Sequence, residues 1–215
     1  MVGRALARVA EHALLLVVGS RTPDGSLDTS VGPVVAHLLA ASACPLVVVP
    51  PRWDMAEERG SVLVGVDETV EALGAVAFAA DAADRCRTSL TAVTVEPRRG
   101  WPDAGATARL LLAEAVAGLG DHHPDVEVTE LVRHGGASSS SELIAAARHG
   151  VRLVVLGARG RHGAEMMLTG STSRAVVRFA PCPIAVLPPI AARRWFRFGS
   201  GHEPAARRSP GRVPS

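Results

Sequence analysis

The chain has 215 residues, enough for one or two domains, and 47% of them are hydrophobic, which supplies a sizeable core. The formal net charge is only +2. The chain therefore does not show the strongly basic composition expected of a protein that binds a polyanion such as nucleic acid. The three cysteines are far apart and lack zinc-site spacing, and no apolar run approaches the ~18 residues of a membrane span. These features favour a cytoplasmic protein with no membrane partner.

Residues 1–50 predict a short unit of two helices and two strands. An amphipathic helix over 1–12 is followed by an apolar strand over 14–18. A helix over about 32–42 and an apolar strand over 46–49 complete the unit. Nothing in the printed sequence before the first strand supplies an earlier one.

Residues 51–60 contain Pro, Gly and charged side chains, which is typical of a linker. Residues 61–188 then alternate strands with helices. This alternation predicts an α/β domain with a doubly wound, five-stranded parallel sheet and helices on both faces. Ligands of such sheets bind beyond the carboxyl ends of the strands. The expected strands are 61–67, 90–95, 126–132, 152–156 and 184–187, and the expected helices are 70–87, 106–119, 140–149 and one after Gly170.

Residues 189–215 are rich in Arg, Pro, Gly and Ser, with six Arg and one Glu. This composition predicts a disordered basic tail. The cluster of Arg193, Arg194 and Arg197 beside Trp195 is interpreted as part of a solvated tail. Contact with nucleic acid or acidic lipid is the alternative.

A glycine-rich loop follows the strand 152–156 and precedes a helix. Gly157, Gly160 and Gly170 stand in the spacing G-x2-G-x9-G, with Ser171 and Thr172 directly after the last glycine. Glycines allow backbone N–H groups to approach phosphate oxygens, and a helix N-terminus adds unpaired N–H groups. The hydroxyls are further donors. The pattern therefore favours phosphate binding, although a tight turn without a ligand would use similar residues.

The G-x2-G-x9-G-S spacing resembles the nucleotide-binding motif of the universal stress protein family. The apolar strand before the loop and the sequence Ala-Pro-Cys-Pro-Ile-Ala-Val-Leu-Pro after its helix are also similar to that family. The resemblance implies a Rossmann-like fold of the adenine-nucleotide alpha-hydrolase type that binds ATP, with or without Mg²⁺. It implies that the loop wraps ribose and phosphates, that Asp67 lies by the nucleotide, and that the Val95 backbone contacts adenine.

The candidate nucleotide-binding residues lie at the ends of three predicted strands and around the glycine loop. Asp67 could instead cap the following helix, Val95 could be simple core, and Arg159 and Arg161 could be surface residues that do not neutralise phosphate. Neither catalytic residues nor metal ligands are assigned. The candidates are Gly65, Val66, Asp67, Val95, Leu156, Gly157, Arg159, Gly160, Arg161, Gly170, Ser171 and Thr172.

The chain also matches itself at an offset of 138 residues without a gap, which predicts that residues 1–50 are a partial repeat packed at the edge of the complete domain. Gly19 aligns with Gly157, Cys44 with Cys182, and the strand 46–49 with 184–187. The first copy is degenerate, because Thr22 replaces the second glycine and Pro33 replaces Ser171. In the resembling family the last strand pairs with its mate in a dimer. We therefore expect a homodimer or an internal pseudo-dimer through 46–49 and 184–187.

The sequence is compatible with three functions. The first is a non-catalytic regulatory module of the stress response whose interactions respond to adenine nucleotide. The second is a nucleotide-independent scaffold, since the first copy has lost motif residues. The third is a slow ATPase, although the chain has no Lys and no nucleophile elbow G-x-S-x-G.

Overall fold

The computed structural model describes residues 2–20, 31–51, 53, 60–96, 104–134, 138–148, 150–158 and 170–199. Of the expected linker 51–60, only Pro51, Trp53 and Gly60 belong to these described residues.

The elements follow the predicted order closely. The first segment contains α1 (Val2–Ala10), β1 (Leu16–Gly19), α2 (Pro33–Ala41) and β2 (Leu46–Val49). The longer segment contains β3 (Ser61–Gly65), α3 (Val70–Cys86), β4 (Leu90–Glu96), α4 (Ala104–Val116), α5 (Leu119–His122), β5 (Val128–His134), α6 (Ser139–Ala147), β6 (Val151–Gly157), α7 (Ser171–Phe179), β7 (Ile184–Leu187) and α8 (Pro189–Gly199). The short α5 and the helix α8 are the elements that the sequence did not predict.

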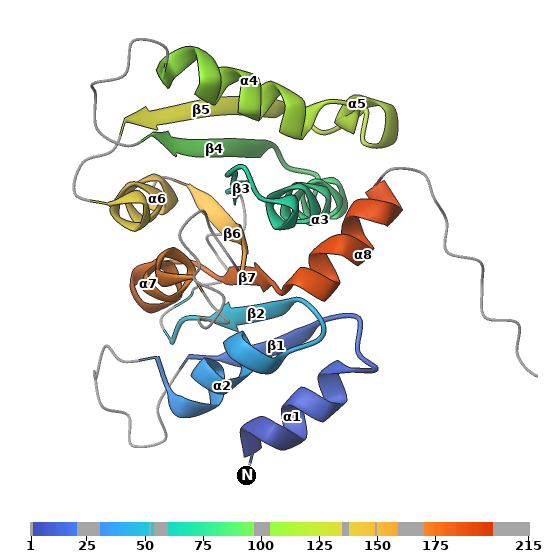
Figure 1. The fold of residues 1–215 in the computed structure, drawn as a ribbon, viewed down its shortest axis with the longest axis vertical. Coiled ribbons are helices and arrows are strands. Elements are labelled where there is room, and N and C mark those ends of the chain that lie inside the picture. The colour runs from blue at the N-terminus through green and yellow to red at the C-terminus, as the bar shows by residue number, and fades with distance from the viewer. Residues whose placement is uncertain are drawn as a thin grey trace, which may run out of the picture.

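All described strands belong to one seven-stranded sheet, in the order β1-β2-β7-β6-β3-β4-β5 (Figure 1). The five strands from β7 to β5 are parallel, which confirms the predicted doubly wound α/β architecture. The strand order reverses between β6 and β3, because β3 pairs with β4 on one side and with β6 on the other. Such a reversal opens a crevice at the carboxyl ends of the strands.

Helices cover the two faces of the sheet and create two cores. One core contains Val35 of α2, Leu143 of α6 and Val176 of α7. The other contains Ala75 of α3 and Leu112 of α4, on the opposite face. The strands between them read as near-continuous apolar runs because both faces are buried. Among the described residues, no helix is long and apolar enough to cross a membrane.

The two strands predicted to meet within one chain do pair. β2 and β7 are antiparallel, with Leu46 opposite Val186 and Val48 opposite Ile184. The other expected arrangement, a homodimer through these strands, stays a prediction. The 138-residue offset also relates the elements. Subtracting 138 from the residue numbers of α7 and β7 gives the bounds of α2 and β2.

The expectation of disorder from residue 189 is wrong for Pro189–Gly199, which form α8. Ala191 and Ala192 are buried, and Ala192 lies against Gly74 of α3. Trp195 packs edge-on against Phe78, with ring centroids 5.0 Å apart. The Arg-rich composition predicted disorder, but the helix also has a face of small residues, Ala191 and Ala192, that packs against α3. Residues 200–215 lie outside the described part of the chain.

Candidate functional site

Several helices begin at the carboxyl edge of the sheet, where the sequence places the candidate site, and α3, α6 and α7 are among them. α3 follows β3, α6 follows β5 and α7 follows the glycine loop after β6. The first N–H groups of a helix have no partner within the helix, so they bind side-chain oxygens, water or ligands. The way in which each helix N-terminus is satisfied therefore decides where an anion can bind.

The N-terminus of α6 is satisfied by its own serines. The Ser138 side chain accepts a hydrogen bond from the Ser141 backbone N–H at 3.2 Å, and the Ser141 hydroxyl accepts one from the Ser138 N–H. The two residues thus form a capping box, in which Ser141 is the partner of Ser138. This helix start is thus occupied by the chain itself.

The N-terminus of α7 has no such side-chain cap. Its N-cap residue is Gly170, which has no side chain with which to cap the helix. Ser171 and Thr172 are the first two residues of α7, and Ser171 is exposed whereas Thr172 is half-buried. Unpaired N–H groups, the positive end of the helix dipole and hydroxyl donors together suit an anion such as phosphate.

Backbone hydrogen bonds fix α7 on the end of β6. The Gly170 N–H donates to the Ala158 carbonyl at 2.6 Å, and the Ala158 N–H donates to the Leu187 carbonyl at 2.8 Å. The ends of the glycine loop are therefore tied together beside the last strand. Arg159, Gly160 and Arg161 belong to the part of that loop that lies outside the described residues.

Ser173 is a positioning residue that sequence reasoning missed. Its side chain is buried, and its hydroxyl donates to the Gly157 carbonyl at 2.9 Å. This bond joins the first turn of α7 to the end of β6. The signal in the sequence was a third hydroxyl directly after Ser171 and Thr172.

Two of the candidate glycines serve close packing. A Cβ on Gly65 would lie 2.6 Å from Leu156 Cδ2, and one on Gly157 would lie 3.2 Å from Glu71 Cβ. Gly157 thus allows the first turn of α3 to lie against the end of β6. The two glycines bring the ends of β3 and β6 and the start of α3 together at the reversal of strand order.

Asp67 holds the N-cap residue of α3, although that helix has no side-chain cap hydrogen bond of its own. Its Oδ1 accepts hydrogen bonds from both the backbone N–H and the hydroxyl of Thr69, the N-cap residue of α3. The side chain is half-buried at the end of β3. Asp67 therefore organises the start of α3 and still lies at the crevice.

Val66, Val95 and Leu156 are buried at the same edge. The Val66 N–H donates to the Val93 carbonyl at 2.8 Å, which links the end of β3 to β4. Glu96 follows Val95 and is also buried, with Oε2 3.1 Å from Nδ1 of His134. Its Oε1 has no hydrogen-bond partner among the residues that the structure describes. The described candidates thus gather at one edge, with Glu96 as an acidic neighbour that the sequence did not single out.

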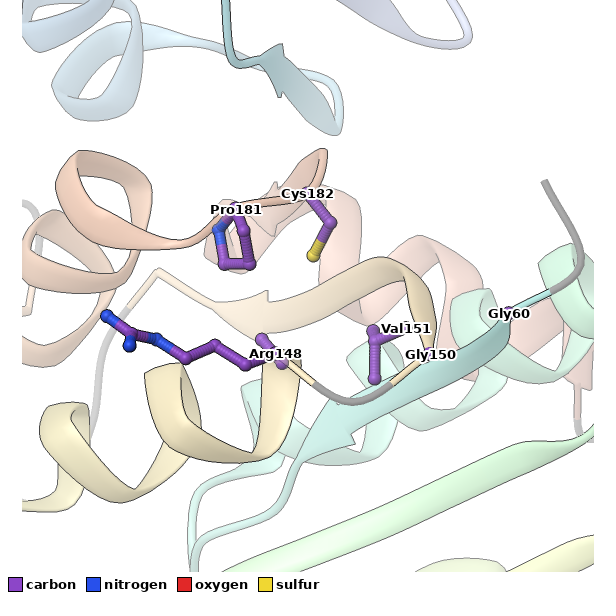
Figure 2. A pocket seen from close by; sticks show the side chains of 7 residues that line it. Gly60, Arg148, Gly150, Val151, Pro181 and Cys182 are labelled. Carbon is purple, nitrogen blue, oxygen red and sulfur yellow. The ribbon is translucent and has the colours of Figure 1, made fainter. Parts of the chain in front are cut away.

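A pocket of about 500 Å³ lies at the opposite, amino-terminal edge of the sheet. Gly60, Val151 and Cys182 line it, and these residues lie at the starts of β3, β6 and β7. Figure 2 shows the Arg148 side chain extending away from the Gly60 end of this pocket. Because this pocket lies at the amino-terminal ends of the strands, it is separate from the candidate nucleotide site at their carboxyl ends.

Comparisons with known proteins agree with this architecture. Residues 58–188 match the model of the universal stress protein family. The chain belongs to the universal stress protein family. It is 30% identical over 191 residues to universal stress protein Rv2623 of Mycobacterium tuberculosis, an alignment that covers 84% of this chain and 63% of that protein. The chain thus spans less than two thirds of the length of that relative.

Solved structures of this family share the fold. A universal stress protein from Archaeoglobus fulgidus matches 86% of this chain and 64% of its own, with a TM-score of 0.64 and 22% identity. Another from Archaeoglobus fulgidus, in complex with dAMP, matches 60% of this chain and 97% of its own, with a TM-score of 0.51 and 21% identity.

Proposed function

We propose that this universal stress protein binds an adenine nucleotide, ATP in the first instance, at the carboxyl edge of β3, β4 and β6. The observation that carries the proposal is the uncapped N-terminus of α7, held against β6 by the bond from Gly170 to Ala158. The dAMP complex of a family member supports an adenine nucleotide as the anion.

The residues at this edge divide into roles by their chemistry. Ser171, Thr172 and the first N–H groups of α7 are proposed to hold phosphate, together with Gly160, Arg159 and Arg161 of the loop. Asp67 is itself negative, so it is proposed to orient ribose or base. Gly65, Val66, Val95, Leu156 and Gly157 are proposed to form the walls, with the Val95 backbone next to adenine. Mg²⁺, where present, would accompany the phosphates.

The bound nucleotide is proposed to act as a regulatory ligand and not as a substrate. Residues 61–188 would form the complete nucleotide-binding domain, and residues 1–50 a partial copy without a site of its own. α2 supports this division, because its N-terminus carries Pro33 where α7 has Ser171, and proline has no N–H to donate. A slow ATPase is the alternative, which multiple-turnover phosphate release would reveal.

Ser171 and Asp67 should affect ligands differently. Ser171→Ala removes one hydrogen bond to a charged group, so we expect ATP affinity to fall roughly 10- to 150-fold while adenosine affinity is retained. Asp67→Ala should weaken ATP and adenosine alike. Calorimetric titration of each variant with both ligands measures these effects.

Asp67→Asn is the matched control for the structural role of Asp67, because the amide oxygen can still accept the bonds from Thr69. If Ser171→Ala weakens adenosine as much as ATP, the phosphate role of Ser171 is wrong. If Asp67→Ala changes neither affinity, Asp67 only holds Thr69 at the start of α3.

A further inference from the structure

The helix α8 has a buried side and a basic outer side. Ala191 and Ala192 are buried, and the contact of Ala192 with Gly74 holds the helix against α3. Figure 1 shows α8 beside α3 at the right of the molecule. Positions i, i+3, i+4 and i+7 share one side of a helix. In α8 the positions opposite the buried alanines follow this spacing and are Ile190, Arg193, Arg194 and Arg197.

The outer side of α8 combines charged and large apolar side chains. Arg193 and Arg194 are exposed. Ile190 is 70% exposed and Phe196 is 42% exposed. An arginine keeps its guanidinium on the polar side of an interface while an apolar neighbour enters the less polar side. This combination suits the boundary between water and an apolar layer better than it suits water alone.

Positive charge is concentrated in this part of the chain. Residues 189–215 hold six Arg and one Glu, a formal charge of +5. The other 188 residues hold 17 Arg and 20 Asp or Glu, a formal charge of −3. An acidic surface would attract α8 and repel the rest of the molecule, so the charge distribution would turn α8 toward that surface.

We infer that the outer side of α8 binds the surface of a membrane that contains acidic phospholipids. The arginines would lie among the phosphate headgroups, and Ile190 and Phe196 would enter the boundary of the acyl chains. The expectation of no membrane partner rested on the lack of a long apolar run, and binding at the surface needs no such run. A nucleic acid offers the same negative charge, but it has no apolar layer to receive Ile190.

Co-sedimentation of the full 215-residue chain with lipid vesicles tests the inference. We expect binding to vesicles made of phosphatidylglycerol and phosphatidylcholine in equal parts, and little binding to phosphatidylcholine alone. Binding to the acidic vesicles should weaken as the salt concentration rises, because salt screens the attraction between exposed charges.

Reversal of two charges on α8 should have a large effect. Arg193→Glu together with Arg194→Glu should weaken vesicle binding roughly 10- to 30-fold, because each arginine near an acidic leaflet contributes about a factor of five. Arg4→Glu together with Arg8→Glu is the matched control, since both residues are exposed on α1, which packs against the core on the opposite face of the sheet. The control makes the same change in net charge and should leave binding nearly unchanged. Circular dichroism checks that each variant is folded.

Ile190→Ser separates a membrane from a nucleic acid as the partner. It should weaken vesicle binding about threefold or more, because the side chain no longer enters the apolar layer. Equal loss in both arginine variants, or no binding to acidic vesicles at low salt, would overturn the inference. Tighter binding to a single-stranded RNA oligonucleotide than to vesicles, lost with the α8 arginines and retained in Ile190→Ser, would assign this side to nucleic acid and overturn the inference as well.

Discussion

Deletion of residues 1–50 is expected to convert the protein into a dimer joined through β7. In the full chain β2 covers this edge, with Leu46, Val48, Ile184 and Val186 all buried. Each fully buried side chain of this size contributes about 1.5–3 kcal/mol, so the uncovered strand exposes a substantial apolar surface. An exposed edge strand is a template for pairing with another chain. The antiparallel geometry that β7 shares with β2 is one that two copies of β7 can adopt.

Light scattering and analytical ultracentrifugation on the full chain and on residues 51–215 measure this effect. Circular dichroism shows whether the shortened chain is folded. A folded shortened chain that stays monomeric at micromolar concentration would show that β7 is not an interface.

Gly74→Ala is expected to destabilise the protein, although the same change stabilises a free helix by up to about 1 kcal/mol. A Cβ at this position would lie 2.1 Å from the Ala192 carbonyl oxygen and 2.5 Å from its Cα. Backbone cannot rotate away as a side chain can, so α8 must shift off α3. Overpacking of this kind costs about 1–3 kcal/mol, and the contact between Phe78 and Trp195 should weaken with it.

Gly105→Ala is the matched control, because Gly105 lies in α4 and a Cβ there meets nothing within 4 Å. We expect it to stabilise the protein by about 0.5–1 kcal/mol. Denaturant unfolding followed by tryptophan fluorescence compares the two variants. Equal shifts in both would mean that Gly74 is not the contact that seats α8.

The sequence predicted most of the fold because each element carries its own local signal. The apolar runs of β2 and β7 and the helix start after Gly170 are bounded by Pro and Gly, so their limits were readable. The helix α8 could not be predicted in this way. It packs against Gly74 of α3, which is far from it in the sequence. Composition describes what a segment can do alone, whereas α8 is folded by what it contacts.

The candidate site was predictable to a similar degree. Strand ends carry sequence signals, and the parallel sheet brings Asp67, Val95 and Gly157 to one edge. The details that depend on three-dimensional contacts were not readable. These include the bond from Ser173 to Gly157, the buried Glu96 beside Val95, and Asp67 as the partner of Thr69.

The central claim is that one nucleotide binds per chain, at the second segment and not at the first. Calorimetric titration of the full chain with ATP tests it most directly. We predict a single site per chain that weakens in Ser171→Ala. No binding, or two sites per chain, would contradict the account.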